Sequence, residues 1–174
     1  MFTRFADLAD ALNERIGRAI AWLTLGMVLL TFGEVVARYA FDSASQAAAD
    51  GITWMHASVF MLGLGYTLVH DAHVRVDLLS RHWSARTCAA VEVGGTLLLL
   101  APFCLLLALG SLDYVAAAWR VREGARDAGG LPGVWALKTL IPLAALLLLL
   151  AGLARAARAW AMLHGTRAAG ARDA

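Results

Sequence analysis

The sequence predicts an all-α integral membrane protein with four transmembrane helices. Four long apolar runs carry this prediction, at about residues 16–41, 52–69, 93–112 and 131–157. Because a helix rises about 1.5 Å per residue, about 20 apolar residues match a hydrocarbon core of roughly 30 Å. The runs show no period-two alternation, so they are not barrel strands. Hydrophobic residues make up 60% of the 174 and charged residues only 16%, against roughly 25% in soluble domains.

The first run predicts a retained transmembrane helix and not a cleaved signal sequence. Its prefix mixes acids with arginines, and the run continues through Glu34 and Arg38 to Phe41. A signal sequence has a short basic prefix and a shorter apolar region. In the prefix, Phe2 to Arg18, apolar side chains recur at helical spacing. This pattern fits either an interfacial helix on the inner membrane surface or a frayed extension of the first span.

The other three runs complete the predicted membrane domain. The second and third contain no Lys, Arg, Asp or Glu, and only Lys138 and Arg155 interrupt the fourth. Between the third and fourth, residues 114–126 are a second candidate interfacial helix. Gly129, Gly130 and Pro132 then predict a turn that re-enters the membrane. We expect one four-helix domain over residues 1–160 and a loose polar tail over residues 161–174.

The distribution of arginine predicts that both termini face the cytoplasm. Four spans place the termini on one side, and the positive-inside rule favours the side with more Lys and Arg. With the termini inside, ten arginines fall in inner segments and three in outer segments. The inner ones are Arg4, Arg15, Arg18, Arg75, Arg81, Arg86, Arg155, Arg158, Arg167 and Arg172, and the outer ones are Arg120, Arg122 and Arg126. Aromatic residues near both predicted surfaces fit the same orientation.

The sequence contains no pattern that supports an enzyme, a cofactor site or nucleic-acid binding. We find no nucleophile beside a base, no Gly-rich phosphate loop and no paired catalytic carboxylates. One short loop is crowded with His70, Asp71, His73 and Asp77, but their spacing matches no metal motif. The net charge is only +2 and the arginines are spread along the chain, so there is no basic stripe for nucleic acid.

Ionisable residues within a span are functional hypotheses by default, because charge is costly in lipid. Glu34 precedes Arg38 by four residues, a spacing that favours an ion pair on one helix face. Two interpretations stay open: a proton or ion relay, and a structural pair that meets a partner subunit. We favour the structural one, since Arg38 can reach the surface. Lys138 can likewise snorkel, or pair with Glu34, Asp50 or lipid phosphate.

Five short segments, taken in order, resemble one protein family. They are EVVARY at 34–39, Asp50 shortly before Trp54, HVRVD at 73–77, GGLP at 129–132 and KTLIP at 138–142. On a four-helix plan this order resembles the DctQ-type small permease subunit of tripartite ATP-independent periplasmic (TRAP) transporters. Two positions depart from the family pattern: Asp50 stands where a Gln-Glu pair is common, and Ala151 where a Gln often follows the leucine run.

The resemblance implies a supporting role in the bacterial inner membrane. In such transporters a periplasmic substrate-binding protein captures a small carboxylate-bearing solute, and a large permease subunit holds the solute and sodium sites. The small permease is a multi-pass scaffold that supports the large one among membrane lipid. An alternative from another class is a small multidrug-type proton antiporter, which acts as a homodimer and would use Glu34 as its proton carrier. Such antiporters have much shorter loops.

Two surfaces are the predicted contacts with partners. Membrane helices associate through close packing of small residues and through polar pairs. The candidate subunit-interface or structural residues are Gly33, Glu34, Arg38, Gly63, Gly65 and Lys138. The candidate periplasmic docking residues, on the outer segment between the third and fourth spans, are Trp119, Arg120 and Arg122.

Overall fold

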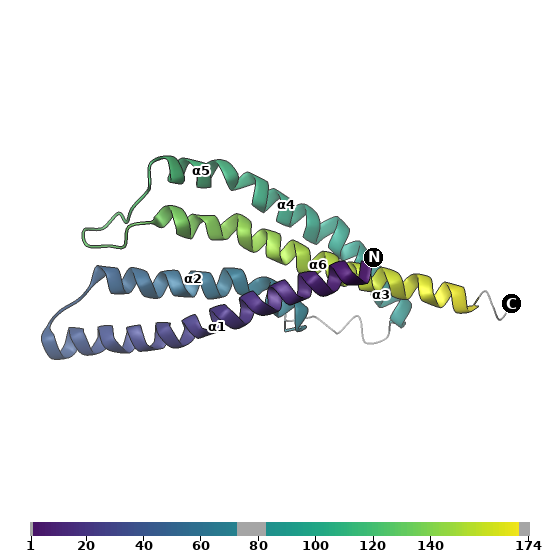
Figure 1. Cartoon of the computed structure of the whole chain (residues 1–174), viewed down its shortest axis with the longest axis horizontal. Coiled ribbons are helices and arrows are strands. Elements are labelled where there is room, and N and C mark those ends of the chain that lie inside the picture. Colours follow the sequence, from purple (N-terminus) through teal and green to yellow (C-terminus); the bar gives the residue numbers. More distant parts are fainter. Residues whose placement is uncertain (1, 73–82, 171–174) are drawn as a thin grey trace.

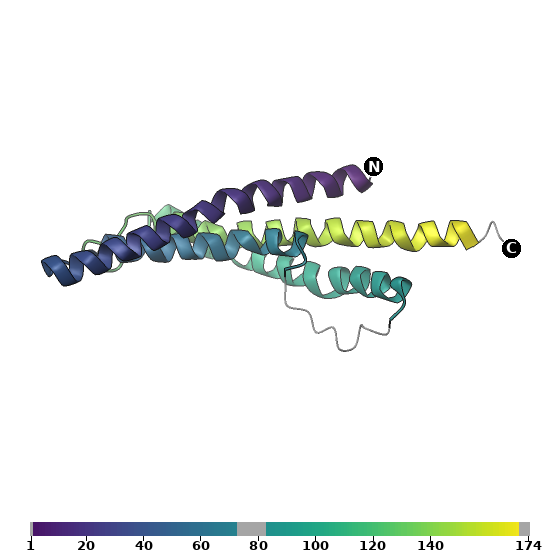
Figure 2. The same cartoon turned by 90° about the horizontal axis from the view of Figure 1, so that it is seen from below.

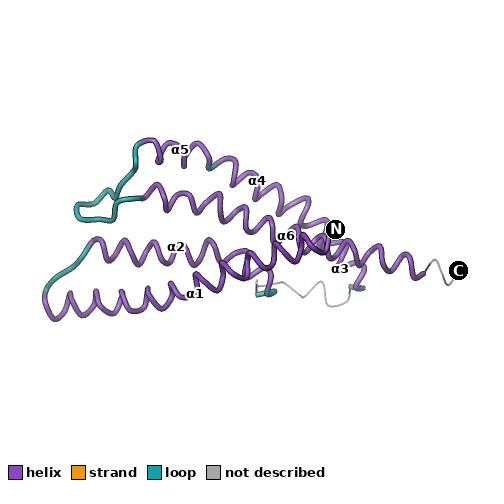
Figure 3. Tube along the Cα trace, in the orientation of Figure 1, coloured by secondary structure: helices purple, strands orange, loops and turns teal. Residues whose placement is uncertain are grey.

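A computed structural model describes residues 2–72 and 83–170, and this part of the chain is helical apart from its connections (Figure 3). The elements are α1 (Phe2–Phe41), α2 (Gln46–Val69), α3 (Ala85–Gly95), the π-helical segment η2 (Thr96–Leu100), α4 (Ala101–Gly110), α5 (Leu112–Arg120) and α6 (Val134–Gly170). Four helices of the described part are long and apolar enough to cross a membrane. They cover Arg4–Phe41, Gln46–Val69, Ala85–Arg120 and Val134–His164. The predicted fold class is confirmed.

The four spans run alternately up and down, so both chain ends lie at one end of the molecule (Figures 1 and 2). We name this the terminal end. The opposite end, with the connections 42–45 and 121–133, is the loop end. The central helix is α6, which contacts α1, α2 and every segment of the third span. The third span packs mainly on α6, so α6 joins it to the α1–α2 hairpin.

The N-terminal prefix continues the first helix. The 40 residues of α1 reach about 60 Å at the α-helical rise, roughly twice the hydrocarbon thickness. Ala6 and Ala9 are buried and pack with Ala154 and Leu150 of α6. Of the two arrangements that the sequence left open, the structure has the extension, because small residues on the prefix meet small residues on α6.

The third span changes helical geometry in its middle. The Ala101 N–H donates to the Thr96 carbonyl, which makes the π-type turn of η2. Pro102 follows directly, and a proline has no N–H to offer the preceding turn. After a turn at Ser111, α5 buries Val115 and Ala118. The helix predicted at 114–126 is thus real, but it is shorter and continues the third span.

Apolar side chains cover the outside of the bundle. Trp22 and Phe32 on α1, and Leu98 and Leu106 on the third span, each expose about 70% of their surface. A soluble protein would bury such side chains, whereas in a membrane they are covered by lipid or by a partner helix. The buried core is correspondingly thin, and it consists largely of alanine, most of it on α6.

Gly65 of α2 is buried against Asn13 of α1 and Leu147 of α6. A Cβ at this position would lie 1.9 Å from Asn13 Oδ1 and 3.0 Å from the Leu147 carbonyl oxygen. We expect Gly65→Ala to lower the unfolding free energy in detergent by about 1–2 kcal/mol, because overpacking outweighs alanine's better helix propensity. Gly63→Ala is the control, since its nearest neighbour would be Ile20 Cδ1 at 3.8 Å. Equal stability of the two variants would contradict this packing.

Candidate functional site

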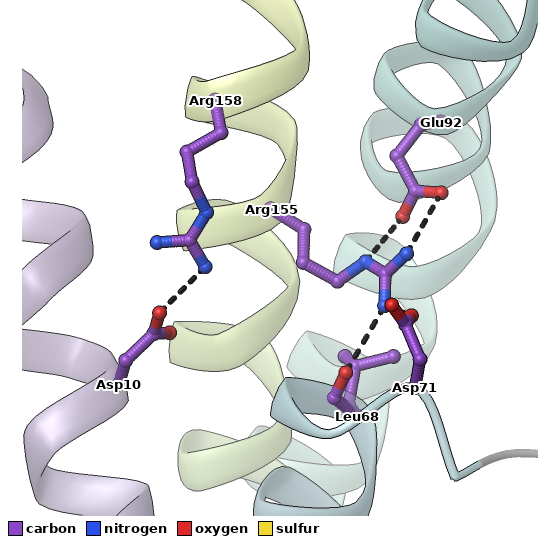
Figure 4. A network of polar contacts seen from close by, with 6 residues as sticks. All are labelled: Asp10, Leu68, Asp71, Glu92, Arg155 and Arg158. Atoms are coloured by element: carbon purple, nitrogen blue, oxygen red, sulfur yellow. Dashed lines mark hydrogen bonds and ion pairs between the residues drawn. The ribbon is translucent and has the colours of Figure 1, made fainter.

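Arg155 of α6 ties three helices together at the terminal end (Figure 4). Its Nε–H donates to Glu92 Oε1 at 2.8 Å, and Nη2 lies 3.4 Å from Glu92 Oε2, so the guanidinium meets α3 in a fork. Nη1 donates to the Leu68 carbonyl oxygen at 3.0 Å and also to Asp71 Oδ1. Leu68 is in the last turn of α2, where carbonyls lack helical partners. The side chain of Arg155 is only 16% exposed.

A second set of ion pairs joins α1 to the same end. Arg158, one turn after Arg155, lies 2.6 Å from Asp10 Oδ2 (Figure 4). Glu14 accepts a hydrogen bond from His70 Nε2 at 2.6 Å and lies 3.0 Å from Arg18 Nε. With the Arg155 contacts, these pairs link all four spans around the terminal half of α6.

Sequence reasoning missed this network. In the sequence, Arg155 is a single charged residue that interrupts the fourth apolar run. Glu92 is the last acidic residue before the third apolar run. Their 63-residue separation carries no local signal. The one available hint was that a carboxylate and an arginine both stand near a predicted inner surface. The loop residues His73 and Asp77 lie outside the described residues, and the described ranges hold no group of three or more His, Cys, Asp or Glu side chains placed to bind a metal.

At the loop end, Glu34 holds the turn between α1 and α2. Its Oε1 accepts the Ser45 N–H at 3.1 Å and lies 3.6 Å from Arg38 Nη2. Ser45 in turn caps α2, because its Oγ accepts the Ala48 N–H at 3.3 Å. The Glu34 carboxylate is 11% exposed and Arg38 is 60% exposed. The predicted Glu34–Arg38 pair is present, and its carboxylate also orders the start of the next helix.

Asp50 connects α2 to the loop at 121–133. Its Oδ2 accepts the Leu131 N–H at 2.9 Å, and its Oδ1 accepts Gln46 Nε2 at 3.0 Å. A Cβ on Gly130 would lie 2.6 Å from Asp50 Oδ2 and 2.4 Å from Ala125 Cβ. Only glycine therefore permits this approach. The acid before Trp54 and the GGLP segment, which are 80 residues apart, form one contact.

Lys138 binds neither of the carboxylates that the sequence suggested. Its Nζ contacts Glu123 Oε2 and lies 3.9 Å from the centroid of the Tyr114 ring. Of the alternatives that the sequence left open for Lys138, a pair with Glu34 or Asp50 is not formed, because the loop folds back and places Glu123 over the start of α6. The cation–π contact with Tyr114 links the same ammonium to the third span.

The predicted docking residues differ in their surroundings. Trp119 donates its Nε1–H to Thr139 Oγ1 at 2.9 Å, and its ring packs edge-on against Trp135. The Arg122 guanidinium lies 5.6 Å from the Trp119 ring centroid and 5.0 Å from that of Trp135. Arg120 is exposed. Arg120 and Arg122 are both exposed, but of the two only Arg122 is shown stacked on the indole rings of Trp119 and Trp135.

The three glycines predicted from the sequence to lie at a subunit interface differ in their surroundings. A Cβ at Gly33 would have no neighbour within 4 Å, so this position is open on the outer surface of α1. Gly63 faces Ile20 of α1 at ordinary contact distance. Gly65 is buried at the crossing of α1, α2 and α6. Gly33 is therefore open to a partner, whereas Gly65 packs within the chain.

Comparison with known proteins supplies the family. Residues 27–162 match the family described as tripartite ATP-independent periplasmic transporters, DctQ component. This chain belongs to the DctQ family. A similar protein is the C4-dicarboxylate TRAP transporter small permease protein DctQ of Vibrio cholerae serotype O1, which is 30% identical over 113 residues. That alignment covers 65% of this DctQ-family chain and 47% of the relative, so the chain spans about half the length of the curated relative it matches. No solved structure matches it.

Family membership confirms the resemblance read from the five segments. This DctQ-family chain is a multi-pass membrane protein, and its family is described as a component of TRAP transporters. The antiporter alternative is not favoured. The geometry agrees, since Glu34 is engaged by the Ser45 amide and by Arg38 at the end of its helix.

Proposed function

We propose that this chain is the small scaffold subunit of a sodium-coupled, binding-protein-dependent secondary transporter in the bacterial inner membrane. The transporter imports a small carboxylate-bearing solute. A large permease subunit holds the solute and sodium sites, and a periplasmic substrate-binding protein delivers the solute. This subunit supplies a stable surface of four helices among membrane lipid, and it binds neither solute nor ion itself.

The observation that carries this proposal is where the polar groups lie. The ion pairs of the described residues gather at the two ends of the bundle, and each charge in them already has a partner within the chain. Hydroxyls inside the spans, such as those of Thr31 and Ser58, donate to carbonyls of their own helix. A carboxylate solute would need several donors or cations to replace its water. The spans of this subunit offer no such set.

Copurification tests the scaffold role. Coexpressed with its large permease, the tagged chain is expected to elute with it as a stable complex, because an open small residue such as Gly33 permits close packing against a partner helix. Gly33→Leu is expected to weaken copurification severalfold by blocking close approach at an open position. Leu98→Ala, on an exposed leucine of the third span, is the control. Purification of this chain as a stable homodimer that does not bind the large permease would overturn the proposal.

We also propose that the terminal end faces the cytoplasm, on the strength of the arginine distribution. In a background without Cys88 and Cys104, Ser43→Cys and Gly124→Cys are expected to react with impermeant thiol reagents in intact cells. Ala85→Cys is expected to react only after the membrane is opened. Labelling of Ala85→Cys in intact cells, with Ser43→Cys protected, would reverse the orientation.

A further inference from the structure

A groove between the third span and α6 changes from basic to apolar along its length. Near the terminal end a cavity of about 250 Å³ is lined by Arg86, Ala90, Trp160, Leu163 and His164. A second cavity, of about 330 Å³, is lined by Val93, Leu97, Leu153, Ala156, Ala157 and Trp160. Because Trp160 lines both, the two cavities adjoin. Figure 2 shows α3 and α6 side by side in this region.

The groove lies on the opposite side of the α3–α6 contact from the Arg155 network. Arg86, Ala90, Val93 and Leu97 follow one another at helical spacing and form one stripe of the third span. Glu92, which binds Arg155, belongs to the other stripe. The cavity beside Glu92 and Arg155 is lined by Ala85, Cys88 and Ala89 of α3, and shares no α3 residue with the groove. The groove is therefore separate from the polar network described above.

The basic end of the groove holds the guanidinium of Arg86 and the imidazole of His164. Within the part of the chain that the structure describes, Arg86 forms no ion pair, whereas Arg155, Arg158 and Arg18 at the same end all bind carboxylates. His164 Nδ1 lies 3.0 Å from the Trp160 carbonyl oxygen. Because a carbonyl only accepts, Nδ1 carries a proton, and Nε2 donates to an anion when the ring is doubly protonated. This end is suited to an anion with several oxygen atoms.

The apolar end lies deeper along the helices. Val93 and Leu97 are seven and eleven residues beyond Arg86, which corresponds to about 10 and 16 Å of helix. Leu97 is half exposed, and no carboxylate or cation lines this cavity. Trp160 stands between the basic and apolar parts, which is the depth that an amphipathic indole prefers in a bilayer. The order of cation, indole and hydrocarbon matches a phospholipid from headgroup to acyl chain.

We propose that this groove binds one anionic phospholipid, with its phosphate on Arg86 and His164 and an acyl chain along Val93, Leu97 and Leu153. Basic pockets between transmembrane helices near a membrane surface bind anionic headgroups in this manner. Arg86 has no ion pair to break within the described chain, and His164 offers Nε2 while Nδ1 keeps its contact with the Trp160 carbonyl. The site is independent of the scaffold role, because it needs no transport and no second subunit.

Native mass spectrometry of the purified full chain tests the site, with equal amounts of palmitoyl-oleoyl phosphatidylglycerol and phosphatidylcholine added in detergent. The first bound lipid is expected to be phosphatidylglycerol by about fivefold or more, the preference that one basic residue supplies. Arg86→Gln with His164→Gln is expected to bring the ratio close to one. Arg15→Gln, which removes an exposed arginine on α1 at the same end, is the control and is expected to leave it unchanged.

Two further arms separate a lipid from a free phosphate and from misfolding. Ala157→Phe and Leu97→Asn alter only the apolar end, and each is expected to reduce retention of phosphatidylglycerol while excess inorganic phosphate does not displace it. Arg86→Lys is expected to recover part of the preference, with unchanged thermal unfolding. Equal retention of the two lipids by the native chain would overturn the proposal. So would an effect of Arg15→Gln as large as that of Arg86→Gln, or full displacement by inorganic phosphate.

Discussion

Proteoliposomes that contain only this chain are expected to show no sodium-driven uptake of a carboxylate solute. Addition of the large permease and of a loaded binding protein is expected to raise uptake from background to a robust rate. The physical reason is that the spans of this subunit offer no set of donors or cations for a dehydrated carboxylate. Radiolabelled solute under an imposed sodium gradient provides the measurement. Robust uptake by this subunit alone would refute the scaffold assignment.

Two variants in the complete transporter sharpen this experiment. Glu34→Gln is expected to retain sodium coupling, because the Glu34 carboxylate accepts the Ser45 amide and serves the α1–α2 turn. Loss of coupling in a complex that assembles normally would instead favour an ion relay. Arg120→Glu is expected to lower uptake severalfold at limiting binding protein, since Arg120 is an exposed cation of the proposed docking segment. Unchanged uptake would remove Arg120 from the docking surface.

Arg155→Leu is expected to be among the most destabilising single substitutions in this chain. It would leave the carboxylates of Glu92 and Asp71, and the Leu68 carbonyl, without their shared donor. A fully buried pair costs about 3–5 kcal/mol to break and an exposed pair about 0–1. Since Arg155 is 16% exposed, we expect a loss of about 2–4 kcal/mol of unfolding free energy.

The measurement is reversible unfolding of the purified chain in mixed detergent micelles. Arg18→Gln is the matched control at the same end, because the Arg18 side chain is 71% exposed and its pair with Glu14 is worth little. Arg155→Lys keeps the positive charge but cannot make the two-pronged contact with the Glu92 carboxylate. We therefore expect a loss of unfolding free energy between those of Arg18→Gln and Arg155→Leu. If Arg155→Leu unfolded at the same denaturant concentration as Arg18→Gln, the network would not hold the helices together.

The sequence by itself determined the four spans, their approximate bounds and the family. These are properties of contiguous segments: the length of an apolar run is compared with the thickness of a bilayer, and short motifs keep their order along the chain. The Glu34–Arg38 pair was predictable for the same reason, since a four-residue spacing on one helix places both side chains together. The sequence also predicted a turn at Gly130, but it did not show why a glycine is needed at that position.

Only the tertiary structure decided which distant groups meet. Lys138 pairs with Glu123 and not with Glu34 or Asp50, because the loop folds over the start of α6. Asp50 binds the Leu131 amide across 81 residues, and Arg155 reaches Glu92 across 63. An apolar run has the same length whichever helix lies beside it, so its sequence does not specify its neighbours. The neighbours of each helix are set by where glycines let two helices approach closely and by where polar side chains find hydrogen-bond partners on another helix. Both kinds of contact join residues far apart in the sequence, so they form only when the helices pack.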